Sequence, residues 1–162
     1  MNLIKHAIIV GIAATTAASA YAEAPTQPRP SPDGKDRSQV QFYDFRNIPP
    51  EALGEGVQRR YVYGEKGMFV IFDLKKGAVV PWHQHPNEQI TYIQDGSVQV
   101  QVREPNGENT YRVSAGQTLV IPGNMPHRFV ALEDTVDLDV FAPPRQDWLD
   151  GTASYFSQDA AQ

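Results

Sequence analysis

Apolar side chains recur at every second position along much of the chain. The clearest case is the run in which Val98, Val100 and Val102 alternate with polar residues. A period of two is typical of a β-strand that buries one face and exposes the other. Similar short runs, separated by turns rich in Gly, Asp, Asn and Pro, follow one another between residues 56 and 141. This pattern predicts an all-β fold with little helix.

The predicted strands are short and closely spaced. The run 68–74 is apolar on both faces, so we expect it at the centre of a sheet. Pro49-Pro50 ends a candidate first strand at 40–45, and single helical turns are expected at 51–53 and 146–149. The other strands are expected around residues 83–85 and at 57–63, 89–93, 98–103, 110–113, 118–121, 128–132 and 135–141.

The first 22 residues have the parts of an export signal. Lys5 is followed by an apolar run at 7–14 and by two A-x-A sites, at 18–20 and 20–22. The apolar run is shorter than the ~20 residues that span a bilayer as a helix. We therefore predict a signal peptide over residues 1–22, a periplasmic or secreted protein, and no membrane span after the signal is removed.

The rest of the chain is predicted to form one domain. Residues 23–39 hold four prolines among small polar residues, a composition that favours a flexible leader. Residues 40–150 would form the β-barrel domain. Residues 151–162 are small and polar and are expected to be a loose tail.

Composition narrows the chemistry that is open to this chain. The net charge is −5 and no basic stripe is present, so a nucleic acid is not an expected partner. The chain has no cysteine, which excludes disulfides and thiolate ligands. A metal ion would therefore have to be bound by imidazole and oxygen atoms.

Three of the four histidines lie in two short stretches of the chain. His83 and His85 stand within residues 77–96, and His127 ends the stretch 116–127. The fourth, His6, lies in the predicted signal peptide. Side chains two apart on a strand point to the same face, so this spacing places two imidazoles where they could bind one metal ion.

The last predicted strand has an unusual polar face. Asp137, Asp139 and Phe141 share one face, and the apolar residues between them share the other. Two interpretations are open: the acids point to solvent, or the strand lines a ligand cavity and the acids point into it. A buried carboxylate without a partner is unfavourable, so the second interpretation requires a function or a partner for Asp139.

These stretches resemble the two motifs of the cupins. The first is Gly77-x5-His83-x-His85-x3-Gln89-x6-Gly96, and the second is Gly116-x5-Pro122-x4-His127. The resemblance implies a single jelly-roll β-barrel and a metal ion inside it. The implied ligands are His83, His85, Gln89 and His127. Cupins usually have Glu where this chain has Gln89, and Glu88 is an alternative ligand if the strand register differs by one residue.

A closer resemblance is to the KdgF-like cupins, which linearise unsaturated uronate sugars from pectin and alginate. It is carried by the pattern His83 to Tyr92, by Asp139-Val140-Phe141 and by the segment from Pro143 to Asp147, which includes Arg145. It implies that Asp139 and Arg145 are catalytic and that Phe141 and Arg145 bind substrate. A surface ion pair with Asp147 or with a partner chain is the alternative role for Arg145.

The implied cofactor is one divalent transition metal, and Ni, Fe, Mn, Co and Zn all suit imidazole and oxygen ligands. The implied partner is a small molecule, in particular an anionic sugar. Alternative functions are a metal-dependent dioxygenase, a lyase acting on a small sulfonium or carboxylate metabolite, and a cupin that binds a sugar or other small molecule without catalysis. A homodimer is expected by analogy with other cupins.

Overall fold

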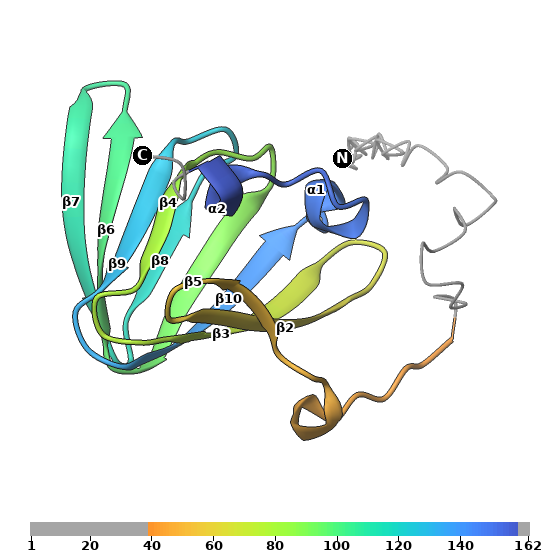
Figure 1. The fold of residues 1–162 in the computed structure, drawn as a ribbon. Coiled ribbons are helices and arrows are strands. Elements are labelled where there is room, and N and C mark those ends of the chain that lie inside the picture. The colour runs from red at the N-terminus through yellow and green to blue at the C-terminus, as the bar shows by residue number, and fades with distance from the viewer. Residues whose placement is uncertain (1–38, 159–162) are drawn as a thin grey trace, which may run out of the picture.

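A computed structural model describes residues 39–158, and it consists of two antiparallel β-sheets that face each other (Figure 1). The predicted signal peptide, all but the last residue of the predicted leader, and residues 159–162 lie outside the described residues. The strands are β1 Glu51–Gly54, β2 Val57–Tyr63, β3 Met68–Leu74, β4 Val79–His83, β5 Glu88–Asp95, β6 Ser97–Glu104, β7 Gly107–Ser114, β8 Thr118–Ile121, β9 His127–Ala131 and β10 Thr135–Ala142. Three short helices are η1 Phe45–Asn47, α1 Gln146–Leu149 and α2 Tyr155–Gln158.

The chain passes repeatedly from one sheet to the other. One sheet has the order β1-β2-β3-β10-β5-β8 and the other has the order β4-β9-β6-β7. Strands that are adjacent in a sheet are often distant in the sequence, as β10 shows by pairing with both β3 and β5. The predicted all-β fold with little helix is confirmed.

The apolar core lies between the sheets and follows the predicted alternation. Along β3 and β6 every second side chain is buried, and the residues between them are more exposed. The core residues on these two strands are Met68, Val70, Phe72, Leu74, Val98, Val100 and Val102. A second group of buried side chains is polar and includes His85, Gln89, Thr91, His127, Asp137, Asp139 and Arg145. This polar group is unusual for a barrel interior, and it forms the site described below.

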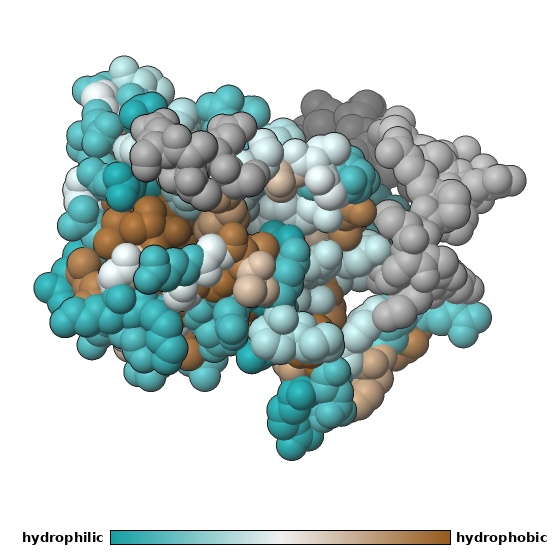
Figure 2. All heavy atoms as spheres, viewed as in Figure 1, coloured by the Kyte–Doolittle hydropathy of each residue, from teal (hydrophilic) through white to brown (hydrophobic). Residues whose placement is uncertain are grey.

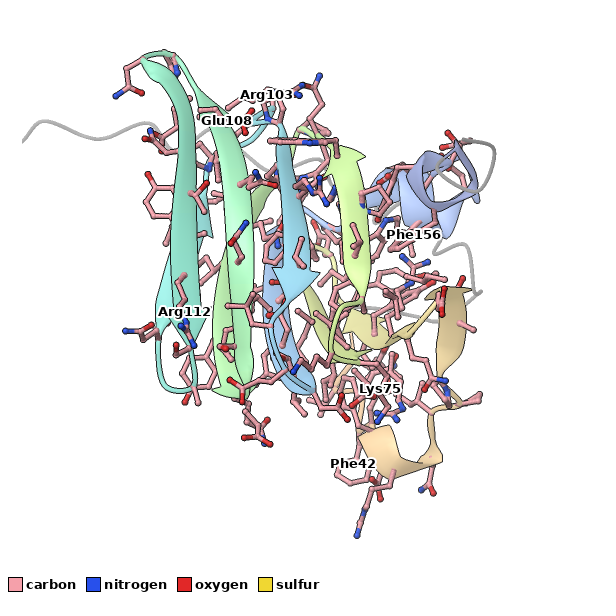
Figure 3. The ribbon with its side chains drawn as sticks, turned by 60° about the vertical axis from the view of Figure 1, so that its left-hand side comes forward. Phe42, Lys75, Arg103, Glu108, Arg112 and Phe156 are labelled. Carbon is pink, nitrogen blue, oxygen red and sulfur yellow. The ribbon has the colours of Figure 1, made fainter. Side chains whose placement is uncertain are left out.

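Two local predictions near the start of the domain are wrong. Residues 40–45 form no strand, and Val40 and Phe42 are 101% and 92% exposed (Figure 3). Residues 51–53, expected as a helical turn, belong to β1, which pairs with β2 at the edge of the larger sheet. Pairing with an available sheet edge outweighs the weak helical preference of so short a segment. The helical turn at 146–149 is confirmed as α1.

The C-terminal segment also differs from the expectation of a loose tail. Residues 155–158 form α2, which packs against β4. The ring of Tyr155 lies parallel to the imidazole of His83, with their centroids 4.3 Å apart. None of the helices in the described part of the chain has the length and apolar character needed to cross a bilayer.

Some apolar side chains remain on the surface, where hydrophilic residues surround apolar patches (Figure 2). On the outer face of the larger sheet, Ile90, Tyr92, Val120 and Val140 are between 38% and 54% exposed. Such a face is a reasonable place for contact with a second copy of the chain. The homodimer stays a prediction.

The corner between β5 and β6 is expected to be sensitive to substitution. Gly96 has a φ of 81°, and a Cβ placed there would collide with the backbone oxygen of Asp134 and lie 2.8 Å from the Cα of Thr135. Gly116 has nearly the same φ, 83°, and nothing within 4 Å of its Cβ position. Gly116→Ala should therefore lower the free energy of unfolding by about 1–2 kcal/mol, the strain of the left-handed conformation. Gly96→Ala should lower it by roughly 1–3 kcal/mol more, because of the collision.

Urea denaturation of both variants measures this difference. Equal losses of unfolding free energy in the two variants would contradict the packing that the structure gives to this corner.

Candidate metal centre

Three imidazoles meet at one end of the barrel, next to α1 and α2. His83 is the last residue of β4 and His127 is the first residue of β9, and the two lie opposite each other in the ladder. His85 follows in the connection between β4 and β5. One ring nitrogen of each histidine lies within 4.8 Å of the ring nitrogens of the other two.

The backbone orients all three rings in the same way. The Nδ1 atoms of His83, His85 and His127 lie 2.8, 3.0 and 2.7 Å from the carbonyl oxygens of Pro81, Asn87 and Met125. A carbonyl can only accept, so each Nδ1 carries the proton and donates it. Each Nε2 is then left with a free lone pair, which is the form in which imidazole binds a metal ion.

Burial keeps these imidazoles neutral. It lowers the pKa of His85 and of His127 to about 4, and the nearby Arg145 guanidinium acts in the same direction. The pKa of His83 is also lowered well below its usual value, first by burial and then by the neighbouring His127. A neutral imidazole does not have to lose a proton before it binds a metal ion.

Gln89 supplies the fourth group that points at this centre. Its amide nitrogen donates to Thr91 Oγ1 and Asp139 Oδ2, both at 3.0 Å, which turns its oxygen toward the histidines. That oxygen, Oε1, lies 3.2 Å from Nε2 of His85.

The contact between Gln89 and His85 pairs two acceptors, because Nε2 has no proton when Nδ1 donates. If His85 carried its proton on Nε2 instead, Nδ1 would be an unprotonated acceptor facing the carbonyl oxygen of Asn87, which is also an acceptor. A cation at the centre removes the conflict by taking both lone pairs. In addition, Nε2 of His127 is buried and has no hydrogen-bond partner among the described residues. The residues therefore fit a divalent metal ion with three imidazole ligands and one amide oxygen.

The predicted convergence of His83 and His85 occurs, but not through one regular strand. β4 ends at His83, and its ladder with β9 is irregular between Val80 and His83. The alternation that we expected does not extend to His85, which reaches the centre from a loop. The alternative ligand Glu88 is excluded, because it is exposed on the outer face of β5 while Gln89 is 2% exposed on the inner face.

Asp139 points into the barrel, so the cavity interpretation of the last strand is correct. It is 3% exposed, accepts a hydrogen bond of 2.5 Å from Thr91 Oγ1 and another from Gln89. Burial raises its pKa to about 6, although these two hydrogen bonds and Arg145 act against the shift. A carboxyl group with a pKa near neutrality can both accept and release a proton under physiological conditions.

Asp137 lies on the same inner face, at the floor of the cavity. It is 2% exposed, and its Oδ1 has no hydrogen-bond partner among the described residues. Burial raises its pKa well above the usual value, and repulsion from Asp139 adds to the effect. Burial and the neighbouring carboxyl group therefore both favour the protonated, neutral form of Asp137.

Arg145 is placed at the site, but its planar fork is already occupied. Its Nε and Nη2 atoms donate to the two carboxylate oxygens of Asp147, at 2.9 and 2.7 Å. The expected grip of the whole fork on a substrate carboxylate is thus not available. Nη1 remains, since it is buried and has no partner among the described residues. The alternative ion pair with Asp147 exists as well, although Arg145 is 1% exposed rather than on the surface.

Phe141 lies between the metal centre and Arg145. Its ring packs edge-on against His85, with centroids 5.3 Å apart, and the guanidinium of Arg145 lies 5.3 Å from its centroid. The expected place of Phe141 in the site wall is therefore supported by its contacts.

Three side chains of this site were not found from the sequence. Thr91 lies two residues after Gln89 on the inner face, so strand alternation could have identified it. The Cζ atoms of Arg59 and Arg145 lie 4.0 and 4.4 Å from the centroid of the Trp148 ring. Tyr155 covers His83. No periodic signal in the sequence connects Trp148 or Tyr155 with the histidines.

The space among these residues is small. A cavity of about 20 Å³ is lined by His83, Gln89, Asp137, Asp139, Phe141, Arg145, Trp148, Tyr155 and three apolar core residues. This is room for about one water molecule. The closed site could therefore hold a metal ion with one small ligand.

A family model for the cupin domain matches residues 70–142. Residues 70–142 therefore form a cupin domain, which confirms the predicted cupin-type jelly-roll fold. Among solved structures the chain is similar to KdgF from Halomonas sp., with 29% identity and a TM-score of 0.62, over 68% of this chain and 99% of that one. It is also similar to an RmlC-like cupin from Shewanella frigidimarina, with 25% identity and a TM-score of 0.61, over 68% of this chain and 96% of that one.

An oxalate decarboxylase from Lactobacillus farciminis has the same fold, at 21% identity and a TM-score of 0.60. This similarity covers 72% of the present chain and 40% of that protein. No curated protein matches the chain.

Metal affinity should depend only weakly on pH in the mildly acidic range. At pH 5.5 an ordinary imidazole is about nine-tenths protonated, and three of them would lower the apparent affinity by about a thousandfold. The pKa of His85 and of His127 is about 4 and that of His83 is also lowered, so all three stay neutral. We expect the affinity for Zn²⁺, measured by calorimetric titration at pH 7.0 and 5.5, to fall by less than about tenfold. A fall of more than about a hundredfold would show that the imidazoles are not buried in this way.

Gln89 and Glu88 are neighbours in the chain and test which face of β5 reaches the metal ion. Gln89→Ala removes the predicted oxygen ligand and should lower the affinity for Zn²⁺ by roughly 10–100-fold. Glu88→Ala is the matched control and should leave it unchanged, because Glu88 lies on the outer face. The opposite result in the same titration would mean that the register of β5 is different.

Proposed function

We propose that this protein is a metal-dependent cupin of the KdgF type, which converts unsaturated uronate sugars to the linear keto form. The observation that carries the proposal is the position of Asp139: a buried carboxyl group that shares the ligand Gln89 with the three-histidine centre through a hydrogen bond. The similarity to KdgF from Halomonas sp. over nearly the whole of that chain supports the proposal.

The ligand set favours an anionic substrate. Three imidazoles and one amide carry no charge, so a divalent metal ion bound to them would keep its full positive charge. Arg145 adds a buried cation that lines the cavity, and its Nη1 atom has no hydrogen-bond partner among the described residues. The carboxylate of a uronate could accept a single hydrogen bond from this atom.

The conversion requires movement of a proton, and Asp139 is placed to carry it. Ring opening moves a proton from the anomeric hydroxyl group to the ring oxygen, and tautomerisation then moves the enol proton to the neighbouring carbon. Thr91 and Gln89 hold the two oxygens of Asp139, so the carboxyl group cannot rotate away from the cavity. Phe141 and Arg145 would orient the sugar against it.

A divalent metal ion bound by His83, His85, Gln89 and His127 would supply Lewis acidity toward substrate oxygens. The elements of the chain itself position the substrate and exclude water: the inner faces of β5 and β10 and the turn into α1 form the walls of the cavity.

Location is part of the same proposal. The predicted signal peptide over residues 1–22 would bring the protein to the periplasm or the exterior. There it would act on products of polysaccharide lyases that work in the same compartment.

The proposal predicts that the metal-loaded protein accelerates the loss of ultraviolet absorbance of an unsaturated galacturonate or of its alginate counterpart. Asp139→Asn should lower this rate by roughly 10²–10⁴-fold, the usual contribution of a general acid–base group. Metal affinity should be retained, because Asp139 is not a ligand. Asp95→Asn, an exposed acid at the end of β5, is the matched control and should keep the wild-type rate.

No acceleration by the metal-loaded wild-type protein with either sugar would overturn the proposed function. Oxygen consumption with phenolic or diketone substrates, measured on the same preparation, would instead support a dioxygenase.

A further inference from the structure

The closed site cannot admit a sugar. Its cavity of about 20 Å³ is far below the roughly 300 Å³ at the lower limit of typical small-molecule pockets. Any ligand larger than a water molecule therefore requires part of the cavity wall to move. The part of the wall that moves should be the one whose movement breaks the fewest stabilising contacts.

Most of the wall is firmly held. Asp137, Asp139, Gln89 and Phe141 project from β5 and β10, which are adjacent strands near the middle of the larger sheet. Moving them would break ladder hydrogen bonds on both sides of β10.

The segment that carries α1 is fastened as well. The ion pair between Arg145 and Asp147 has two hydrogen bonds, and Trp148 is 6% exposed and packed against Arg59 and Arg145. In addition, Asn87 donates to the carbonyl oxygens of Pro143 and Pro144, which ties this segment to the loop of His85.

The other wall residues on strands, such as Val80 on β4 and Phe129 on β9, are also held by a ladder. The part of the wall that no ladder holds is α2, which has only one turn and lies at the C-terminal end of the described chain. It reaches the site through residues 151–154, all of which are exposed. Gly151 at the start of this linker has a φ of 73°, a conformation that lets the chain change direction there.

Two aromatic rings hold α2 against the barrel. Tyr155 stacks on His83 with an angle of 9° between the rings. Phe156, which is labelled in Figure 3, lies against Gly54 at the end of β1. Contacts of this kind can be exchanged for contacts with a ligand, since they do not depend on a backbone ladder.

We propose that Tyr155 is the residue that decides which ligands reach the metal centre, because its ring is the movable wall over His83. In the closed form the ring covers His83, and the cavity has room for about one water molecule. The backbone N–H groups of Thr152 and Ala153 donate to the carbonyl oxygen of Asp147, so the linker is held up to Ala153. When α2 swings outward beyond this point, the centre opens to a ligand of the size of a sugar acid. This inference rests on the shape of the site and holds whether or not the substrate is a uronate.

The exchange of the metal ion tests this without any substrate. In the full-length protein loaded with Ni²⁺, Tyr155→Ala should raise the rate of metal removal by excess EDTA, an anionic ligand larger than the cavity, by at least about tenfold. The rate of Ni²⁺ uptake should rise by the same factor, so that the equilibrium affinity is unchanged. Tyr155→Phe keeps the ring and should behave like the wild type, as should Tyr92→Ala, which removes an exposed tyrosine from the outer face of β5.

The ratio of the two rates separates a movable wall from a structural support. A ring that merely holds His83 in place would, on removal, raise the release rate alone and weaken the affinity. That result, or unchanged rates in Tyr155→Ala, would overturn the proposal.

A second variant provides a test that does not depend on the folding of Tyr155→Ala. A Cβ at Gly54 would lie 3.3 Å from the Cδ1 atom of Phe156, so this ring is the second contact that holds α2 against the barrel. Phe156→Ala keeps Tyr155 but weakens the attachment of α2, and it should raise the rates of Ni²⁺ removal and uptake together, by at least about threefold. Unchanged rates in Phe156→Ala would overturn the proposal.

Discussion

Three imidazole nitrogens and one amide oxygen face each other inside the barrel, and all four present lone pairs. This arrangement is unfavourable without a cation, and several parts of the structure maintain it. The carbonyl oxygens of Pro81, Asn87 and Met125 hold the protons of the three rings on the outer side. Burial prevents the rings from becoming protonated instead. The protein therefore places neutral ligands around one point before any metal ion arrives, which reduces the reorganisation that binding would require.

The strand β10 brings acid chemistry to the same place. Its inner face carries Asp137 and Asp139, and its two neighbours are β3 and β5. Gln89 connects the acids to the metal centre, because its oxygen faces His85 and its nitrogen donates to Asp139. A change of charge at the metal centre therefore alters the electrostatic energy of Asp139, and a change of charge on Asp139 alters that of the metal centre. This coupling explains why a glutamine suits the position: a carboxylate there could not donate to Asp139 and would repel it.

Aromatic side chains close the end of the barrel next to the metal centre. Trp148 and Phe141 surround the guanidinium of Arg145, and Tyr155 covers His83. These rings exclude water from the site, which strengthens the electrostatic interactions within it. Phe141 lies on β10, whereas Trp148 and Tyr155 come from the segment after this last strand, which the jelly-roll does not need for its own sheets. The same fold can thus carry different closures, which is consistent with its occurrence in proteins as different as KdgF and oxalate decarboxylase.

The sequence by itself determined the parts that follow from local periodicity and spacing. Short runs of β-prone residues between turn signals were enough to place β2, β3 and β8 at their observed bounds, and the two histidine motifs were enough to indicate one metal centre. Tertiary structure alone decided that His85 approaches from a loop, that Asp147 occupies the fork of Arg145, and that Tyr155 lies on His83. The physical reason is that a strand's pattern is set by the side chains next to it in the chain. The partner of a sheet edge, a guanidinium group or an aromatic ring is instead a residue that can be distant in the sequence, because the fold brings it into contact.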